Sequence, residues 1–131
     1  MTDYKFEHVG ITVNSIEETA KWYETNLGFK RGEIIDKPGL ELRLCKIGLD
    51  KFCLEVLEPY EKKYFLKESN DVVELFSRPG LNHMAFCVSD LNESYRRMME
   101  NGVQIITSII DSKYFLCRDN NGISLEIKQA K

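Results

Sequence analysis

The sequence predicts an α+β fold built from two βαβββ units, and three observations carry this prediction. Two stretches about 75 residues apart read as copies of one another, FEHVGITVNSIEETAKWYETN from Phe6 and LNHMAFCVSDLNESYRRMMEN from Leu81. Each copy places a histidine, His8 or His83, at the start of a strand pattern that leads into an amphipathic helix pattern. Each half of the chain also closes on a strand that carries a glutamate. Repetition of one unit therefore organises the chain.

The first unit is expected to span residues 1–58. Alternating apolar residues predict a strand at 5–13, and Asn14 or Ser15 then offers an N-cap to a helix that ends at Gly28. Turn signals separate three further expected strands, at 29–35, 40–47 and 51–58.

A linker at residues 59–79, partly helical around an apolar run, leads to the second unit at 80–131. Its first strand, at 81–88, precedes Ser89 or Asp90 as the N-cap of a helix that ends at Gly102. The remaining strands are expected at 103–109, 113–118 and 123–128. Together the two units predict a curved, mostly antiparallel, eight-stranded sheet with the helices outside.

Size and charge limit the classes of function. A chain of 131 residues can bury a sizeable core, whereas each half alone would be marginal, so the halves are expected to pack together or across a dimer. The net charge is -3, and no basic cluster interleaves with aromatic residues, which disfavours a nucleic-acid partner. No long apolar run occurs near the N-terminus, so we expect a cytoplasmic protein without a membrane partner that acts on a small molecule.

The four cysteines suggest neither a disulfide framework nor a zinc ribbon, because they are widely spaced and form no C-x-x-C motif. They are Cys45, Cys53, Cys87 and Cys117. We expect them to be small buried hydrophobic residues, with a reactive thiol at one of them as the lesser alternative.

Strand alternation indicates which way the candidate site residues point, because successive side chains face opposite sides of a sheet. In the first unit, aliphatic residues alternate with His8 and with Glu55, which puts both on the face away from the helix. The same parity applies to His83 and Glu126 in the second unit. Two imidazoles and two carboxylates on matching faces indicate a metal site.

This ligand set suits a first-row divalent ion such as Ni, Co, Mn, Fe or Zn. Taken singly, a strand histidine or glutamate is more often a hydrogen-bonded or solvated side chain. The chain has only two histidines, however, and both occupy the same position of the repeat. That coincidence favours the metal site.

Four segments together resemble the vicinal oxygen chelate superfamily, which includes glyoxalase I, methylmalonyl-CoA epimerase, extradiol dioxygenases, and fosfomycin and bleomycin resistance proteins. These segments are HVGITVNSIEETAKWYETNLGF, CLEVLEP, GLNHMAFCVSDL and RDNNGISLEI. The resemblance implies paired βαβββ units, a homodimer, and one divalent ion held by His8, Glu55, His83 and Glu126. A carboxylate at Glu55 favours the glyoxalase I and epimerase branches, because dioxygenase and fosfomycin sites typically have three ligands.

In those branches the substrate chelates the ion and a carboxylate removes a proton next to its carbonyl. The resemblance therefore implies a metal-dependent lyase, isomerase or epimerase, with Glu126 as base slightly favoured over Glu55. Arg43 could point into the cleft and hold a substrate carboxylate or phosphate, or lie along the rim in solvent.

Two other functions remain open. One is a metal-free protein that sequesters an antibiotic or another small molecule, although such relatives typically lack a complete ligand set. The other is an Fe(II) extradiol-type dioxygenase that uses His8, His83 and Glu126 as a facial triad.

Overall fold

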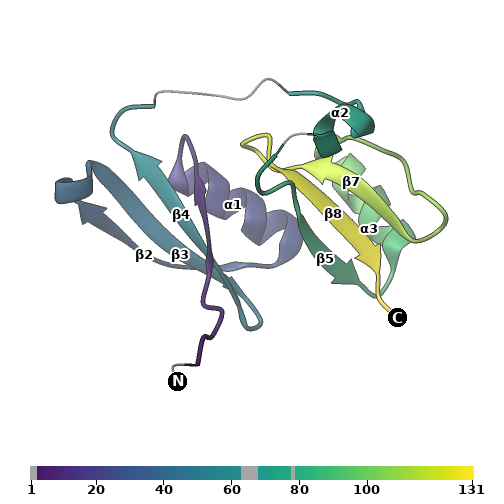
Figure 1. Ribbon diagram of the computed structural model, residues 1–131. Helices are drawn as coiled ribbons and strands as arrows, with labels where there is room; N and C mark the ends of the chain where they lie inside the picture. Colours follow the sequence, from purple (N-terminus) through teal and green to yellow (C-terminus); the bar gives the residue numbers. More distant parts are fainter. Residues whose placement is uncertain (1–2, 63–67, 78) are drawn as a thin grey trace. The chain divides into compact units, whose positions relative to one another are not determined.

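The computed structural model describes residues 3–62, 68–77 and 79–131. The chain divides into two compact units, residues 1–64 and 65–131, each with its own sheet and helices (Figure 1). The α+β class is confirmed, and the eight strands form two four-stranded sheets, one in each unit. Parts of the expected linker, at 63–67 and 78, lie outside the described residues.

The sheet of the first unit has the order β1-β4-β3-β2, with β1 parallel to β4 and the other pairs antiparallel. In this register Glu55 of β4 lies between Gly10 of β1 and Lys46 of β3. Glu55 is therefore central to its sheet. The elements are β1 (Val9–Thr12), α1 (Ile16–Leu27), β2 (Lys30–Lys37), η1 (Pro38–Leu40), β3 (Leu42–Leu49) and β4 (Phe52–Pro59).

The sheet of the second unit repeats this order as β5-β8-β7-β6, again with a parallel first pair. Glu126 of β8 lies between Ala85 of β5 and Leu116 of β7, so it occupies the position that Glu55 has in the first sheet. The elements are α2 (Val72–Ser77), β5 (Met84–Val88), α3 (Leu91–Glu100), β6 (Gln104–Ile105), β7 (Tyr114–Arg118) and β8 (Ser124–Gln129).

Strand β6 is much shorter than the strand expected at 103–109. After Ile105 the backbone N–H groups of Ile106 and Thr107 both donate to the Leu116 carbonyl, at 2.8 and 3.1 Å. The Thr107 hydroxyl in turn accepts from the Leu116 N–H at 3.0 Å. The regular ladder between β6 and β7 ends here, because two N–H groups share one carbonyl and a side-chain hydroxyl replaces a backbone acceptor.

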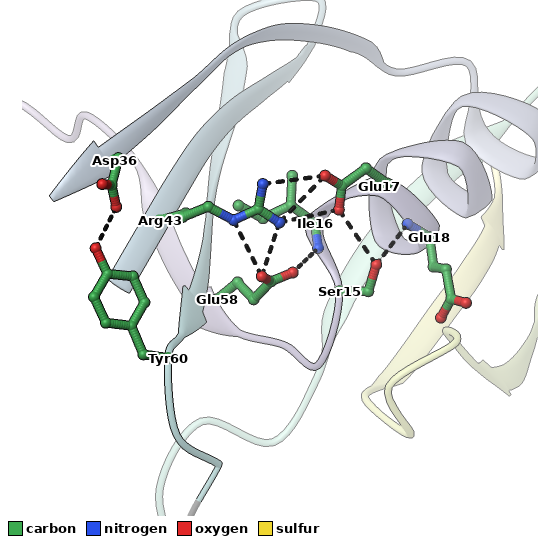
Figure 2. Close-up of polar contacts among 8 residues, drawn as sticks. All are labelled: Ser15, Ile16, Glu17, Glu18, Asp36, Arg43, Glu58 and Tyr60. Carbon is green, nitrogen blue, oxygen red and sulfur yellow. Dashed lines mark hydrogen bonds and ion pairs between the residues drawn. The ribbon is translucent and has the colours of Figure 1, made fainter. Parts of the chain in front are cut away.

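Each long helix begins with the same set of hydrogen bonds. Ser15 accepts from the Glu18 N–H at 3.2 Å, and Asp90 accepts from the Glu93 N–H at 3.0 Å. A side chain from the last strand of each unit then satisfies the first helical N–H. These contacts are Glu58 to Ile16 at 2.8 Å (Figure 2) and Gln129 to Leu91 at 2.9 Å. The last strand therefore fixes where each helix starts.

The cores confirm the strand parity expected from the sequence. In the first unit Ile16, Ala20 and Tyr23 of α1 are buried together with alternate residues of β3 and β4. The second unit is built in the same way, with Leu91 and Met98 of α3 buried. The alternate strand residues of these cores are Cys45, Ile47, Leu54 and Val56 in the first unit, and Phe115, Cys117, Leu125 and Ile127 in the second. The residues between them, including both glutamates, face away from this core. Leu116 and Arg118 of β7 are also buried, but on the opposite face of the second sheet.

The C-terminal part of the expected linker belongs to the second unit. Arg118 of β7 is 1% exposed and donates to the Ser69 carbonyl and, at 2.8 Å, to Asn70 Oδ1. Gln104 donates to the Glu68 carboxylate at 3.2 Å. The buried Arg118 thus fixes residues 68–70, which precede α2, against the sheet of the second unit. None of the described helices is long and apolar enough to cross a membrane.

Candidate metal centre

In the first unit, His8 lies directly before β1 and faces the centre of its sheet. Its Nε2 atom is 3.7 Å from Glu55 Oε2, and its Nδ1 atom is 2.9 Å from Glu7 Oε1. The side chains of His8 and Glu55 are 33% and 20% exposed, so solvent reaches the pair only partly. The strand alternation that placed His8 and Glu55 on one face agrees with this contact.

In the second unit, His83 and Glu126 form the same pair. His83 Nε2 is 3.4 Å from Glu126 Oε2, and His83 Nδ1 is 2.8 Å from Asn82 Oδ1. The two side chains are 30% and 18% exposed. Both histidines therefore present Nε2 to a glutamate while the preceding residue holds Nδ1.

This arrangement fits the needs of a metal ligand. A neutral imidazole binds a metal through one nitrogen, and a hydrogen bond from its other N–H to a carboxylate or carbonyl fixes the ring. Two ligands with bonds of about 2.05 Å at a tetrahedral angle lie roughly 3.3 Å apart. The Nε2-to-carboxylate distances of 3.7 and 3.4 Å are close to that separation and longer than a normal hydrogen bond. Each unit therefore offers two of the ligands that a divalent ion requires.

Within either unit, the described residues bring together no group of three or more His, Cys, Asp and Glu side chains that could hold a metal ion. The structure thus shows two matched pairs of candidate ligands, one in each unit, on the face of the sheet that points away from the long helix.

The surroundings of the two pairs differ in charge. Lys46 lies opposite Glu55 in the register, and its amine is 3.4 Å from Glu7 Oε1. Hydrogen bonds from His8 and then from Lys46 lower the pKa of the Glu7 carboxyl, so it stays ionised at neutral pH. The corresponding position opposite Glu126 is Leu116, which is buried. Lys46 was not among the candidates predicted from the sequence, although its strand parity relative to buried Cys45 and Ile47 indicates this face.

Arg43 lies on the other face of the first sheet, on the side of helix α1 (Figure 2). It shares the parity of buried Cys45 and donates to Glu58 at 2.8 Å and to Glu17 at 3.2 Å. Its guanidinium therefore joins β3 and β4 to the start of α1, on the face opposite to Glu55. These contacts give no support to the hypothesis that Arg43 holds a substrate.

The expectation for the cysteines holds at two positions and is wrong at a third. Cys45 and Cys117 are buried, and burial raises the pKa of the Cys117 thiol to about 12. Cys53 is half-buried. Cys87 is exposed, because β5 is an edge strand and its residues Ala85 and Cys87 face away from the core. All four thiols are free.

The family model of the Glyoxalase/Bleomycin resistance protein/Dioxygenase superfamily matches residues 5–127, which is nearly the whole chain. The chain belongs to this superfamily. Its residues 5–127 include both histidine–glutamate pairs, so the resemblance to vicinal oxygen chelate proteins is confirmed.

Individual relatives agree with the superfamily assignment. The uncharacterized protein YqjC of Bacillus subtilis is 27% identical over 139 positions, covering 97% of this chain and 93% of its own. The structure of Leishmania major glyoxalase I is similar with a TM-score of 0.77 at 21% identity, covering 97% of this chain and 87% of that one. The fosfomycin resistance protein FosX from Mesorhizobium loti is similar with a TM-score of 0.73 at 12% identity, covering 99% and 94%. At these identities the solved structures support the superfamily fold.

Proposed function

We propose that this protein is a divalent-metal-dependent lyase, isomerase or epimerase that removes a proton next to the carbonyl of a chelated substrate. The observation that carries the proposal is the repeated pair, in which His Nε2 faces a glutamate and Nδ1 is held by the preceding residue. Similarity to glyoxalase I in fold supports it.

Four residues would hold the ion, His8, Glu55, His83 and Glu126. Imidazole nitrogen with carboxylate oxygen is a donor set that suits Ni, Co, Mn, Fe or Zn. When bound, the ion would polarise the substrate carbonyl and offset the negative charge that develops as the neighbouring proton leaves.

Glu126 is the residue to which we assign the proton transfer. Its carboxylate would accept the proton from the substrate carbon and return it to the neighbouring carbon or to the opposite face. Its neighbour in the register is the buried side chain of Leu116, which brings no charge to compete for the carboxylate. Glu55 has Lys46 in that position, and we therefore assign it to holding the ion.

A repeated pair also favours an enzyme over a protein that only sequesters its ligand. Sequestration by shape and apolar contact needs no oriented imidazole. Here both histidines are oriented by a separate acceptor, Glu7 or Asn82, at 2.9 and 2.8 Å. Such acceptors are typical of metal-ligating histidines.

The first experiment measures the metal content of protein purified without a histidine tag. We expect about one first-row metal per chain, lost in each single variant His8→Ala, Glu55→Ala, His83→Ala and Glu126→Ala. Glu100→Gln is the matched control, because Glu100 is an exposed carboxylate on α3 that pairs with Arg96 at 2.5 Å. Protein that stays metal-free after reconstitution with Ni, Co, Mn, Fe(II) and Zn would contradict the proposal.

The second experiment tests the reaction in the metal that binds. The substrates to screen are hemithioacetals of 2-oxoaldehydes and epimeric acyl-CoA thioesters, in D₂O, with NMR detection of deuterium entering next to the carbonyl. Deuterium incorporation that depends on the metal supports proton abstraction. Oxygen consumption in place of deuterium exchange would identify the Fe(II) dioxygenase alternative.

We also propose that the protein acts as a homodimer. Strand β2 is an edge strand exposed along its whole length, and its Ile34 and Ile35 are 39% and 42% exposed. The unpaired backbone groups of an edge strand can pair with a second chain, and two exposed isoleucines would add apolar contact there. Analytical ultracentrifugation should give a dimer, and Ile35→Lys should shift it toward the monomer.

A further inference from the structure

One side chain, Asn82, connects helix α2 to His83. Its Nδ2 atom donates to the Leu75 carbonyl at 2.7 Å, and its Oδ1 atom is 2.8 Å from His83 Nδ1. Leu75 is the buried residue of α2, and the next residue, Phe76, packs against the His83 ring with the ring centres 6.0 Å apart. Helix α2 therefore contacts His83 twice, through the ring of Phe76 and through Asn82.

The Leu75 carbonyl determines how this chain of hydrogen bonds is directed. A carbonyl oxygen can only accept, so it must face the NH₂ group of Asn82. The amide oxygen of Asn82 is then the atom that faces His83 Nδ1. That oxygen also only accepts, and its 2.8 Å contact is a hydrogen bond, so Nδ1 carries the hydrogen. The Glu126 oxygen is 3.4 Å from Nε2, longer than a normal hydrogen bond, so the lone pair of the neutral ring lies on Nε2.

We propose that Asn82 is a positioning residue that holds His83 in the Nδ1–H tautomer and makes this state depend on the docking of helix α2. The first part concerns the protein without metal. The consequence for metal affinity rests on the function proposed above.

In the first unit the tautomer of the histidine is set without contact to a helix. Glu7 takes the place of Asn82, and an ionised carboxylate accepts with either oxygen, so the His8 tautomer needs no further partner to direct it. The control of a histidine by α2 is therefore expected in the second unit only, and His8 serves as an internal reference.

The tautomers can be observed directly, because the chain has only two histidines. The experiment uses metal-free protein labelled with ¹⁵N-histidine and long-range ¹H–¹⁵N NMR near pH 8.5, where an ordinary imidazole is neutral. Wild type should show both rings as Nδ1–H. Asn82→Leu has no acceptor and should move His83, but not His8, toward the Nε2–H form. Asn82→Asp keeps an acceptor and should leave His83 as Nδ1–H.

Asn82→Asp also separates the two roles of the amide. It removes the donor to the Leu75 carbonyl and puts a second acceptor there, so hydrogen exchange in residues 72–77 should become faster than in wild type. Zn²⁺ titration should show affinity about 10-fold to 100-fold weaker in Asn82→Leu, with Asn82→Asp restored to within about 3-fold of wild type. Far-UV circular dichroism checks that both variants fold.

An unchanged His83 tautomer in folded Asn82→Leu would overturn the proposal, and so would a tautomer change that Asn82→Asp fails to reverse. If Asn82→Leu does not fold, a shift of His83 to Nε2–H in Asn82→Asp overturns it, and retention of Nδ1–H with faster exchange in α2 supports it. Failure of wild type to bind Zn²⁺ would count against the proposed function, while the tautomer measurement would still decide the role of Asn82.

Discussion

The two units of this protein repeat one geometry, but three partner residues that are charged in the first unit are neutral in the second. In both, a histidine Nε2 faces a glutamate, the preceding residue holds Nδ1, and a side chain of the last strand caps the helix. The partners in the first unit are charged, and their counterparts in the second are neutral. The pairs to compare are Glu7 with Asn82, Lys46 with Leu116, and Glu58 with Gln129.

This difference shows which features the repeat preserves. Backbone register and the direction of each imidazole are retained, because any acceptor can hold Nδ1 and any side-chain oxygen can cap a helix. Charge is free to diverge, and it gives the two glutamates different neighbours. We therefore expect the two units to differ in their chemistry. Glu55 of the first unit is suited to hold the metal ion, and Glu126 of the second unit is suited to transfer a proton.

The largest expected effect separates the two glutamates. Once a substrate is identified, Glu126→Gln should lower kcat by roughly 100-fold or more while the protein retains its metal, because the amide cannot accept the proton. Glu55→Gln should chiefly weaken metal binding and recover much of its turnover at high metal concentration. Metal titration and steady-state kinetics on both variants measure this, and full activity in both would refute the assignment of a carboxylate base.

A smaller effect concerns the residues opposite the glutamates. Leu116→Ala should lower the free energy of unfolding by about 2–5 kcal/mol, because it opens a cavity at a side chain that is 3% exposed. Lys46→Ala, at a side chain that is 53% exposed, should change it by less than about 0.5 kcal/mol. Urea unfolding of both variants, with Leu116→Met as the volume-matched control, tests this. Equal losses of unfolding free energy in Leu116→Ala and Lys46→Ala would mean that burial does not distinguish the two positions.

The smallest expected effect is the acid sensitivity that Glu17 gives to the start of α1. A hydrogen bond from its own backbone N–H and then the Arg43 guanidinium lower the pKa of Glu17. Its charge thus stabilises the first unit above its ordinary pKa, and that contribution disappears as the pH falls through the lowered value. The corresponding residue on α3 is Asn92, but α3 has the carboxylate of Asp90 as its N-cap where α1 has the hydroxyl of Ser15, so the effect of Glu17 is isolated by a variant of α1 itself.

Hydrogen-exchange protection measures this at pH 6 and pH 3.5. The first turn of α1 should lose up to about 1 kcal/mol on acidification as the Glu17 charge is lost. Glu17→Gln should lose less than wild type over the same pH range. An equal loss in wild type and in Glu17→Gln would show that the Glu17 charge makes no difference to this helix start.

Much of the fold could be predicted because it follows from local patterns. The repeat and the strand alternation indicated the order of the elements, and the histidine and glutamate of each unit do meet. The N-caps of the structure, Ser15 and Asp90, are each one of the two residues that the sequence offered. Arg43 was harder, because its face depends on the register between β3 and β4. The acceptors Glu7 and Asn82 looked like ordinary polar neighbours, since a hydrogen bond between adjacent side chains leaves no periodic signal. The shortened β6 arose from the competing hydroxyl of Thr107.

The hydrogen bonds of Gln129 redefine where the second unit stops. If burial of apolar side chains alone set its boundary, the second unit would end at Ile127, the last residue of its core. Yet the Gln129 amide accepts from the Leu91 N–H at 2.9 Å and donates to the Ser89 carbonyl at 2.7 Å, clasping the turn that leads into α3. A truncated or fused protein must therefore keep the chain through Gln129, and a separately expressed first unit must likewise extend through Glu58.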